Sequence, residues 1–326
     1  MAGEEGGAVE PKAHTPEMQI HHYQGYPAML DFSPITIKDK ELFTQRLTDY
    51  NPQASELNFT NLFMWRDYYR FLYCIHLDYL CIISVPDERP CFSFIPVRKY
   101  ERESFFETIN RLKEYFKKRK LPIRFSRIAE NELSRFEELG IPAEQFTFEP
   151  DHSDYIYSSS DLICLDKSCL NYKRNLLRRF KQNNSYEYFT INAGNVDECI
   201  KINSDWFHNK GGGDSQLTFE LVANSEVLKN YEVLGCSGAL IKVNGKFEAF
   251  TYGDQLNSDT AVIHAEHANR NIPGLYNFIN QKFCEMEWSR LPYINREQDL
   301  GLEGLRKAKI SYNPLKRVRK HSITLN

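Results

Sequence analysis

The order of apolar and polar positions along the chain predicts an alternation of strands and helices that occurs twice. In the first half, two runs rich in aromatic and β-branched residues are separated only by Leu77-Asp78, which predicts a hairpin. A later run places apolar residues at helical spacing, and a short helix after it ends at Gly140. The expected elements are strands over 70–76, 79–85 and 91–96, a helix over 103–118, a strand over 121–125 and a helix over 130–139.

The second half repeats this order of elements without repeating the letters. Asn244-Gly245 lies between two β-rich runs and is the strongest short hairpin signal in the chain. Both halves read strand, strand, strand, helix, strand, helix, and both are preceded by further helical segments. The expected elements are strands over 238–243, 246–252 and 260–267, a helix over 273–287, a strand over 293–295 and a helix over 302–309, with preceding helices over 38–47, 57–69, 170–181 and 196–208.

These connections predict the α/β (α+β) class, with two tandem domains that each hold a mixed sheet flanked by helices. Hairpins make neighbouring strands antiparallel, whereas a helical crossover makes them parallel. A polar Asp/Ser/Tyr stretch near 150–160 is expected to join the domains. We therefore predict a flexible lead-in over 1–30, a first domain over 31–155 that serves as a scaffold, and a second domain over 156–326 that carries the candidate site.

Composition and charge describe an ordinary globular protein. Of its 326 residues, 41% are hydrophobic and 26% charged, and a net charge of −3 excludes a polyanion binder driven by net charge alone. The eight cysteines form no C-x-x-C pair and no cluster with zinc-ligand spacing, so we expect reduced thiols and no metal. No apolar run approaches the roughly 20 residues of a membrane helix, and the N-terminus has no signal sequence, which predicts a soluble cytoplasmic protein.

The segment 269–276 leads from a predicted strand into a predicted helix and is a candidate ligand site. Pro273 suits the first helical position, and Gly274 would let a ligand approach the backbone. Free N–H groups and the helix dipole at such a start favour a phosphate or carboxylate, with Arg270 as an added charge. The alternative is an ordinary Pro/Gly helix start. The neighbouring residues expected to contact the ligand are Asn271, Leu275 and Tyr276.

Two ionisable side chains lie on the strand before this segment. Strict alternation along 260–267 would place His264 and Glu266 on one face of the sheet. A carboxylate or imidazole there can accept the proton that an attacking amine must lose, so both residues are candidate catalytic bases. The alternative is a solvated polar face.

The C-terminal segment 295–314 combines a predicted helix with an unusual concentration of cations. Asp299 is placed to cap the helix, and Arg306 and Lys309 stand one turn apart on it. Between 306 and 321 there are seven Lys or Arg residues and no Asp or Glu, which suits a phosphate, a tRNA acceptor end or a developing oxyanion. A solvated charged face is the alternative. The apolar positions of the helix are Leu302, Leu305 and Ala308.

A second basic cluster lies on the predicted helix 170–181. Arg174, Arg178 and Lys181 share one face at helical spacing, and Lys173 lies close to them in the sequence. The helix also carries Tyr and Asn side chains between the cations, a combination that suits contacts with a phosphate backbone. These four residues are the candidate nucleic-acid-binding residues.

Several motifs resemble the family that shares the C-terminal domain of phosphatidylglycerol lysyltransferase, which is similar to the Fem-type aminoacyl transferases. The resemblance covers about residue 31 to the C-terminus, and the doubled order of elements resembles tandem GNAT-type acyltransferase domains. The matching stretches are Glu56 to Leu62 with Trp65-Arg66, Lys173-Arg174-Asn175 with Phe180, Gly274-Leu275-Tyr276 with Ile279-Asn280, Asn295-Arg296-Glu297-x-Asp299-Leu300-Gly301, and Gly304-Leu305-Arg306-x-x-Lys309-x-x-Tyr312-x-Pro314.

The resemblance implies an acyltransferase that moves an aminoacyl group from aminoacyl-tRNA to an amine or hydroxyl, such as a lipid head group, with Lys309 in the transfer site. We expect Glu266, with His264, to act as the base. Lys309 and Arg306 would stabilise the oxyanion or the donor phosphate, and Tyr312 would protonate the leaving group.

Two other functions remain open at this level. One is N-acetylation of a small molecule with an acyl-coenzyme A donor, whose phosphate end Arg270 and Gly274 would hold. The other is a non-catalytic module that binds tRNA or another phosphate-rich partner through the helix over 170–181. In aminoacyl transfer and in acetylation the donor is a substrate, so no resident cofactor is expected. The sequence indicates neither the acceptor nor the oligomeric state.

Overall fold

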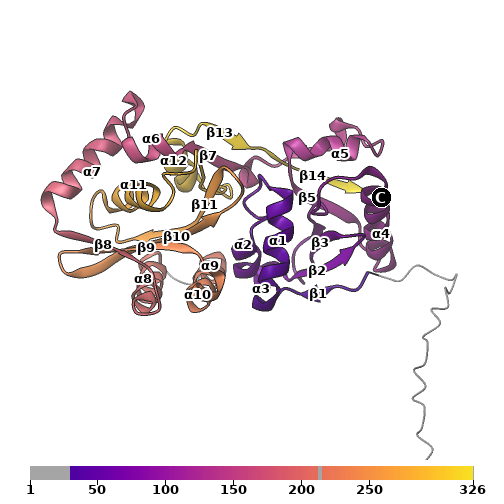
Figure 1. Cartoon of the computed structure of the whole chain (residues 1–326), viewed down its shortest axis with the longest axis horizontal. Coiled ribbons are helices and arrows are strands. Elements are labelled where there is room, and N and C mark those ends of the chain that lie inside the picture. The colour runs from indigo at the N-terminus through magenta and orange to yellow at the C-terminus, as the bar shows by residue number, and fades with distance from the viewer. Residues whose placement is uncertain (1–29, 212–214, 326) are drawn as a thin grey trace, which may run out of the picture.

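The computed structural model describes residues 30–211 and 215–325. These residues form two lobes that lie side by side, each built on a mixed sheet with helices packed against it (Figure 1). This architecture confirms the predicted α/β (α+β) class. The lead-in expected over 1–30 lies, apart from Leu30, outside the described residues. Within 30–211 and 215–325, no helix is both long enough and apolar enough to cross a membrane.

The first lobe contains the N-terminal half of the chain and the last strand. Its elements are β1 (Ser33–Pro34), α1 (Lys40–Tyr50), α2 (Phe59–Met64), α3 (Arg66–Tyr69), β2 (Phe71–His76), β3 (Tyr79–Ser84), β4 (Phe92–Ser93), α4 (Arg102–Lys118), β5 (Ile123–Ala129), α5 (Leu133–Glu137), β6 (Thr147–Phe148) and β14 (Lys320–Leu325). The strand order is β1-β2-β3-β4-β5-β14-β6, with β4 and β5 parallel. The crossover helix α4 buries Phe105, Leu112 and Phe116 in the core beside β5.

The second lobe contains the rest of the chain. Its elements are β7 (Asp154–Ser158), α6 (Ser159–Cys164), α7 (Asn171–Asn183), β8 (Tyr186–Thr190), α8 (Val196–Asn209), α9 (Ser215–Lys229), α10 (Tyr231–Leu234), β9 (Ser237–Val243), β10 (Lys246–Gln255), β11 (Thr260–Ala268), α11 (Leu275–Glu287), β12 (Tyr293–Asn295), α12 (Glu303–Ile310) and β13 (Lys316–Val318). The strand order is β13-β7-β12-β11-β10-β9-β8, with β11 and β12 parallel. Helices α11 and α7 cover one face of this sheet, and α8 to α10 cover the other (Figure 1).

Local sequence explains the turns and the start of the first crossover helix. The two predicted hairpins turn through the left-handed region, with φ of 45° and 68° at Leu77 and Asp78, and 49° and 85° at Asn244 and Gly245. Glu101 caps α4 by accepting hydrogen bonds of 3.0 and 2.8 Å from backbone N–H groups of its first turn. Short 3-10 turns complete the connections at Ile37–Asp39, Glu130–Glu132, Ala143–Gln145, Pro150–His152 and Ser168–Leu170.

Six strands, β1, β6, β7, β8, β13 and β14, were not predicted, and two of them, β7 and β14, change the organisation of the chain. The polar stretch near 150–160, predicted to be a joint, contains β7, most of which is buried. β14 leaves the second lobe and pairs with β5 and β6, so residues 320–325 complete the first sheet although the prediction assigned 156–326 to the second domain. Both strands hold buried charges whose partners lie in other elements. Lys320 Nζ of β14 donates to Asp154 Oδ1 of β7 at 2.6 Å.

Candidate functional site

The second sheet opens between its two parallel strands. β11 and β12 pair over residues 260–262 and 293–295, and β11 then continues to Ala268 without β12 beside it. The chain after β12 runs through 296–302 to the start of α12. Two charged pairs bridge the opening. Each joins a side chain of β11, beyond its pairing with β12, to a side chain of the segment 296–302. We therefore examine this opening as the candidate site.

Glu266 and Arg296 form the central pair in the opening. Arg296 Nη2 donates to Glu266 Oε1 at 3.2 Å, and Asn280 Nδ2 of α11 donates to Glu266 Oε2 at 2.9 Å. The charged side chains are only 12% and 14% exposed. Arg296 Nη1 is also buried, and it has no hydrogen-bond partner among the described residues. An unpaired buried guanidinium N–H next to a carboxylate suits an oxygen atom that carries negative charge.

Lys309 reaches the same place from α12. Its Nζ donates to the backbone carbonyls of Arg296 and of Glu297, the second at 3.4 Å. Burial lowers the pKa of Lys309 to about 8, and the nearby Arg296 charge acts in the same direction. An ammonium has three N–H groups, and within the described part of the chain two carbonyls accept from this one, which leaves a donor for a ligand.

Tyr312 and Lys173 complete the group from the side of α7. Tyr312 Oη accepts from Asn277 Nδ2 at 2.7 Å, and Lys173 Nζ and Arg296 Cζ lie 4.2 and 4.7 Å from the centre of the Tyr312 ring. Burial raises the pKa of Tyr312 well above its usual value, so the phenol keeps its proton at neutral pH. The residues that meet here, called the Arg296 cluster below, are Lys173, Glu266, Asn277, Asn280, Arg296, Lys309 and Tyr312.

His264 does not join the Arg296 cluster, although strict alternation predicts that it shares a face with Glu266. Pairing between β10 and β11 skips His264, and this β-bulge changes the alternation along the strand. The imidazole is fully buried, with Nδ1 2.8 Å from Glu297 Oε1 and Nε2 3.3 Å from Asp254 Oδ2. Burial by itself lowers the pKa of His264, but the two carboxylates outweigh it and raise the pKa to about 9. An imidazolium that donates both N–H groups has no nitrogen free to accept a proton.

The start of α11 is covered by α7 and is not open to a ligand at Gly274. This residue has a φ of 86°, and a Cβ added to it would lie 2.7 Å from the carbonyl oxygen of Leu176. Glycine is required here by the left-handed backbone and by the close approach of the two helices. Leu275 is fully buried in the core below, and Tyr276 packs against the same core.

Arg270 and Asn271 line a separate pocket beyond the end of β11. Its volume is 480 Å³, and α8 forms another wall that includes Trp206. Burial lowers the pKa of Lys210 at the end of α8, and the positive charge of Arg270 acts in the same direction. The two cations therefore lie close enough to favour an anion together. None of the residues lining this pocket belongs to the Arg296 cluster.

Helix α12 presents an apolar surface to solvent and a lysine to the interior. Leu302 is 50% exposed, whereas Lys309 is 9% exposed. The cap of the helix is Leu302, so the prediction that Asp299 caps it is wrong. Asp299 is buried and accepts from Arg306, whose Nη2 also donates to Asp151 at 2.6 Å. Arg306 is thus paired with two carboxylates and does not reach the Arg296 cluster.

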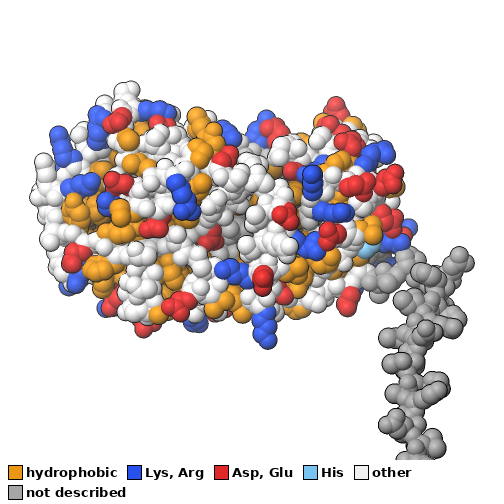
Figure 2. All heavy atoms as spheres, in the orientation of Figure 1, with side chains coloured by type: hydrophobic (Ala, Val, Ile, Leu, Met, Phe, Trp, Pro, Cys, Tyr) orange, Lys and Arg blue, Asp and Glu red, His pale blue; other side chains and the backbone are white. Residues whose placement is uncertain are grey.

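The basic residues of α7 divide between the cluster and the surface. Lys173 contacts Tyr312, whereas Arg174, Arg178 and Lys181 are exposed. Figure 2 shows several Lys and Arg side chains over the part of the surface where α7 lies. Exposed cations along one helix give the electrostatic footprint that a phosphate-rich partner requires.

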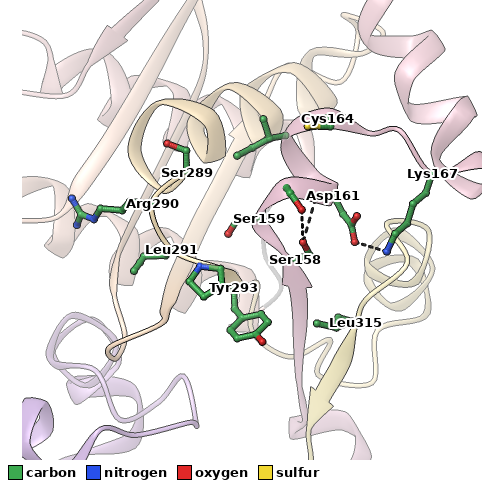
Figure 3. Close-up of a pocket in the computed structure, with 13 residues that line it drawn as sticks. Ser158, Ser159, Asp161, Cys164, Lys167, Ser289, Arg290, Leu291, Tyr293 and Leu315 are labelled. Atoms are coloured by element: carbon green, nitrogen blue, oxygen red, sulfur yellow. Dashed lines mark hydrogen bonds and ion pairs between the residues drawn. The ribbon is translucent and has the colours of Figure 1, made fainter.

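A pocket of 660 Å³ beside the start of α6 contains none of the predicted site residues (Figure 3). Ser158 Oγ and Ser160 Oγ lie 2.8 Å apart, and Lys167 donates to Asp161 at 2.5 Å. Ser159 Oγ is buried without a hydrogen-bond partner in the described part of the chain. Asp161 and Lys167 of this pocket pair with each other, and Arg290 donates to Gln255 Oε1 at 3.3 Å, so the pocket does not combine a carboxylate, cations and a phenol as the Arg296 cluster does.

The cluster contains the parts that acyl transfer requires. A carboxylate such as that of Glu266 can accept a proton, cations such as Lys309 and Arg296 can stabilise an oxyanion, and a phenol such as that of Tyr312 can donate a proton. Sequence reasoning placed three of these residues in the site and gave Arg296 no role. The signal for Arg296 was its position in the motif shared with the resembling family, next to the short strand over 293–295.

Known proteins match this chain over most of its length. A family described as phosphatidylglycerol lysyltransferase, C-terminal, matches residues 47–323. A conserved protein of unknown function from Bacteroides thetaiotaomicron is 32% identical, with coverage of 91% of this chain and 100% of its own and a TM-score of 0.85. L-PGS from Bacillus licheniformis is 14% identical, with coverage of 87% and 91% and a TM-score of 0.61. FemX is 9% identical, with coverage of 91% and 98% and a TM-score of 0.59.

No curated protein sequence matches the chain significantly. The structures of low identity establish the fold, which is that of tandem GNAT proteins, as predicted. The family match over 47–323 covers most of both sheets and contains every residue of the Arg296 cluster. The chain belongs to the phosphatidylglycerol lysyltransferase C-terminal family of acyl and aminoacyl transferases.

Proposed function

We propose that the protein transfers an aminoacyl group from an aminoacyl-tRNA to an amine or hydroxyl acceptor at the Arg296 cluster. The observation that supports this most is the buried Nη1 of Arg296, which has no hydrogen-bond partner in 30–211 and 215–325 and lies in a site that also holds a carboxylate and a lysine. Such a site offers a proton acceptor next to cations that stabilise a developing oxyanion. Membership of a family of acyl and aminoacyl transferases supports the reaction class.

Glu266 is assigned the role of proton acceptor. Each of its oxygens accepts one hydrogen bond, from Arg296 or from Asn280, and retains a lone pair for the proton of the attacking group. The nitrogen or oxygen of the acceptor bonds to the acyl carbon while its proton passes to Glu266. The carbonyl oxygen becomes negative, and the N–H groups of Arg296 and Lys309 stabilise that charge.

Tyr312 is assigned the role of proton donor to the leaving oxygen. As the ester bond between the acyl carbon and the donor breaks, the phenol proton passes to the oxygen that departs. Lys173 and Arg296 next to the ring stabilise the resulting phenolate. The next exchange with solvent returns Tyr312 to its protonated form and removes the proton from Glu266, so the net reaction is acyl transfer alone.

The remaining predicted residues are assigned to binding and support. Arg174, Arg178 and Lys181 on the exposed side of α7 are assigned to tRNA phosphates. The pocket at Arg270 is assigned to another anionic group of the donor or acceptor. The acceptor class includes a lipid head group that carries a free hydroxyl or amine. Aminoacyl-tRNA is a cytoplasmic substrate, and we place the reaction there. Arg306, paired with two carboxylates, is assigned a structural role.

Radiolabelled transfer by Lys309→Ala and Lys307→Ala tests this proposal. Lys309 is buried in the cluster, whereas Lys307 is exposed on the same helix and pairs with Glu303 one turn away. Loss of one oxyanion donor lowers kcat by roughly 100- to 1000-fold. We expect that loss for Lys309→Ala and near wild-type transfer for Lys307→Ala. Equal turnover by wild type and Lys309→Ala would remove Lys309 from the mechanism.

The packing around Gly274 separates this proposal from coenzyme A-dependent acetylation. A coenzyme A donor would need the backbone at the start of α11, and the carbonyl of Leu176 in α7 lies against that position. A thermal-shift comparison distinguishes the two donors, because a ligand at 100 times its dissociation constant stabilises a protein by about 2.7 kcal/mol. We expect stabilisation by aminoacyl-tRNA and none by acetyl-coenzyme A. Salt-sensitive tRNA binding without transfer of any donor would instead favour a non-catalytic module.

A further inference from the structure

A side chain of the first domain reaches the segment that carries Arg296. Asn61 lies on α2 and is only 3% exposed. Its Nδ2 donates to Glu297 Oε1 at 3.0 Å, across 236 residues of sequence. The same carboxylate oxygen accepts from His264 Nδ1 at 2.8 Å. Two donors from different domains therefore converge on one oxygen of the residue next to Arg296.

Glu297 holds a backbone conformation that needs such support. Its φ is 56°, in the left-handed region that residues with a side chain rarely adopt. The backbone N–H of Glu297 donates to Asn295 Oδ1 at 2.7 Å, and its carbonyl accepts from the N–H of Tyr155 at 3.1 Å. These bonds fix the backbone next to Arg296, whose side chain extends to Glu266. A strained residue persists only where its surroundings hold it in place.

Residues of the first domain also support Asn295, the last residue of β12, which lies two positions before Glu297. Asp154 accepts from Asn295 Nδ2 at 3.0 Å and from the backbone N–H of Ser55 at 2.9 Å. Lys320 of β14 donates to Asp154 and to Glu56, and all three of these charged side chains are buried. A buried ion network that loses one member becomes strongly unfavourable, so this contact keeps the two lobes in register.

We propose that Asn61 is a positioning residue of the transfer site, which makes the first domain part of the catalytic arrangement. The inference rests on the proposed function for its kinetic consequence. Asn61 acts through Glu297: it fixes the carboxylate, and thereby the carbonyl groups of residues 296 and 297 that hold Lys309. Removal of the Asn61 amide leaves His264 as the donor to Glu297 Oε1. The segment that contains residues 296 and 297 can then shift.

The titration of Lys309 reports on this geometry without any assay of activity. The charged groups that act on its ammonium are Arg296, Glu297, Asp154 and Glu266, and all of them belong to the segment or its supports. The Tyr155 ring lies 6.0 Å from Nζ, and the Tyr157 hydroxyl donates to the Lys309 carbonyl. If the segment moves, water reaches Nζ and the pKa of Lys309 rises from about 8 toward 10.5.

The first experiment follows the Lys309 titration by heteronuclear NMR in the full chain with isotope-labelled lysine. The variants are Asn61→Ala and the matched control Asn131→Ala, whose amide Nδ2 donates to the adjacent Glu132 at 3.3 Å in the same domain. We expect the Lys309 midpoint to rise by roughly half a pH unit or more in Asn61→Ala and to stay in place in Asn131→Ala. If Asn61→Ala does not fold, Asn61→Ser provides a shorter polar side chain at the same position. An unchanged midpoint in the folded variant overturns the positioning role.

The second experiment measures transfer by the same variants and by Asn61→Ala in a Glu297→Ala background. A small displacement of reacting groups lowers the rate by up to about 100-fold, so we expect a loss of roughly 10- to 100-fold in kcat with little change in KM for Asn61→Ala. In the Glu297→Ala background the second substitution should add less than about twofold, because both act through one carboxylate. Additive losses overturn the proposal. A wild-type protein that transfers no donor refutes the proposed function, while the NMR midpoint still decides the positioning role.

Discussion

In each sheet two parallel strands separate after a short pairing, β4 from β5 in the first and β11 from β12 in the second. Different side chains occupy the two openings. In the first sheet, β4 and β5 pair at a single position, and the residues that continue β4, Phe94 and Ile95, are 1% and 2% exposed. In the second sheet, β11 continues past its pairing with β12 and carries Glu266 into the opening, where Arg296 meets it. Aromatic and aliphatic side chains surround the first opening, beside one buried ion pair between Arg127 of β5 and Glu56, whereas two charged pairs bridge the second opening.

This difference shows which features belong to the shared fold of the two halves and which belong to the candidate site of the second half. Both halves use similar hairpins and crossover helices, and each has a buried arginine–glutamate pair beside its parallel strands, with different surroundings. Arg127 beside the first opening is paired with Glu56 at 3.3 Å, whereas the buried Nη1 of Arg296 in the second lacks a hydrogen-bond partner among the described residues. A buried polar group without a partner costs stability unless a ligand completes it. We infer that the chain repeats the fold and places the reaction in one copy.

Replacement of Glu266 by Gln should cause the largest change. General base catalysis contributes roughly 100- to 10,000-fold to a rate, and the amide keeps the size of the side chain while it loses the basic oxygen. We expect a loss in that range in kcat for Glu266→Gln, measured by single-turnover transfer. Glu285→Gln is the matched control, since this exposed glutamate of α11 pairs with Lys282 on the surface. Full activity of Glu266→Gln would shift the base to another residue.

Replacement of Phe94 by Ala should affect stability and leave chemistry intact. Truncation of a fully buried phenylalanine costs about 3–5 kcal/mol, because contacts are lost and a cavity remains. We expect a lower denaturation midpoint in urea together with near wild-type transfer per folded molecule. A loss of transfer as large as that of Glu266→Gln in folded Phe94→Ala would mean that both openings take part in the reaction.

The starts of the two crossover helices offer a second contrast. α4 is capped by the Glu101 side chain, whereas α11 starts at Gly274 against the Leu176 carbonyl. Gly274→Ala combines a left-handed backbone with a steric clash, and we expect a cost of roughly 2–5 kcal/mol in the free energy of unfolding. Glu101→Ala should cost much less, because the loss of an exposed helix cap leaves the packing of the domain intact. Equal costs in urea unfolding would show that α7 yields easily at this contact and that the start of α11 can open.

The charged opening should also make stability depend on pH through His264. Its folded pKa of about 9 lies above the ordinary value of 6.5, so its stabilisation is complete below about pH 6.5 and is lost as the pH rises through 9. We expect the difference in unfolding free energy between wild type and His264→Gln to fall by on the order of 3 kcal/mol from pH 6 to pH 10. The difference between the two proteins cancels other groups, including Lys309. A difference that does not vary with pH would mean that His264 is neutral in the fold.

Much of the fold follows from local sequence. The two hairpins, the crossover helices and the three-residue strand Tyr293–Asn295 have local signals in turn residues and periodicity, and the structure has them within a few residues of the predicted bounds. β7 and β14 do not, because Asp154 and Lys320 become buried only after they pair with each other. No window of the sequence contains both residues, so each strand looks polar on its own.

The site follows from the sequence in part, for the same reason. Glu266, Lys309 and Tyr312 stand out as chemical groups, and the structure brings them to Arg296. The bulge that separates His264 from Glu266 depends on the pairing of β10 with β11, and a simple period of two cannot predict it. The inward position of Lys309 depends on two carbonyls that the segment after β12 presents, and that geometry has no local signal.

The central claim is that acyl transfer takes place at the Arg296 cluster of the second sheet. Its most direct test is a crystal structure with a hydrolysis-resistant analogue of an aminoacyl-tRNA acceptor end. We expect the acyl carbonyl oxygen within hydrogen-bond reach of Arg296 or Lys309 and the acyl carbon facing Glu266. An analogue bound at the first sheet, or in the pocket that contains Ser159, would contradict it.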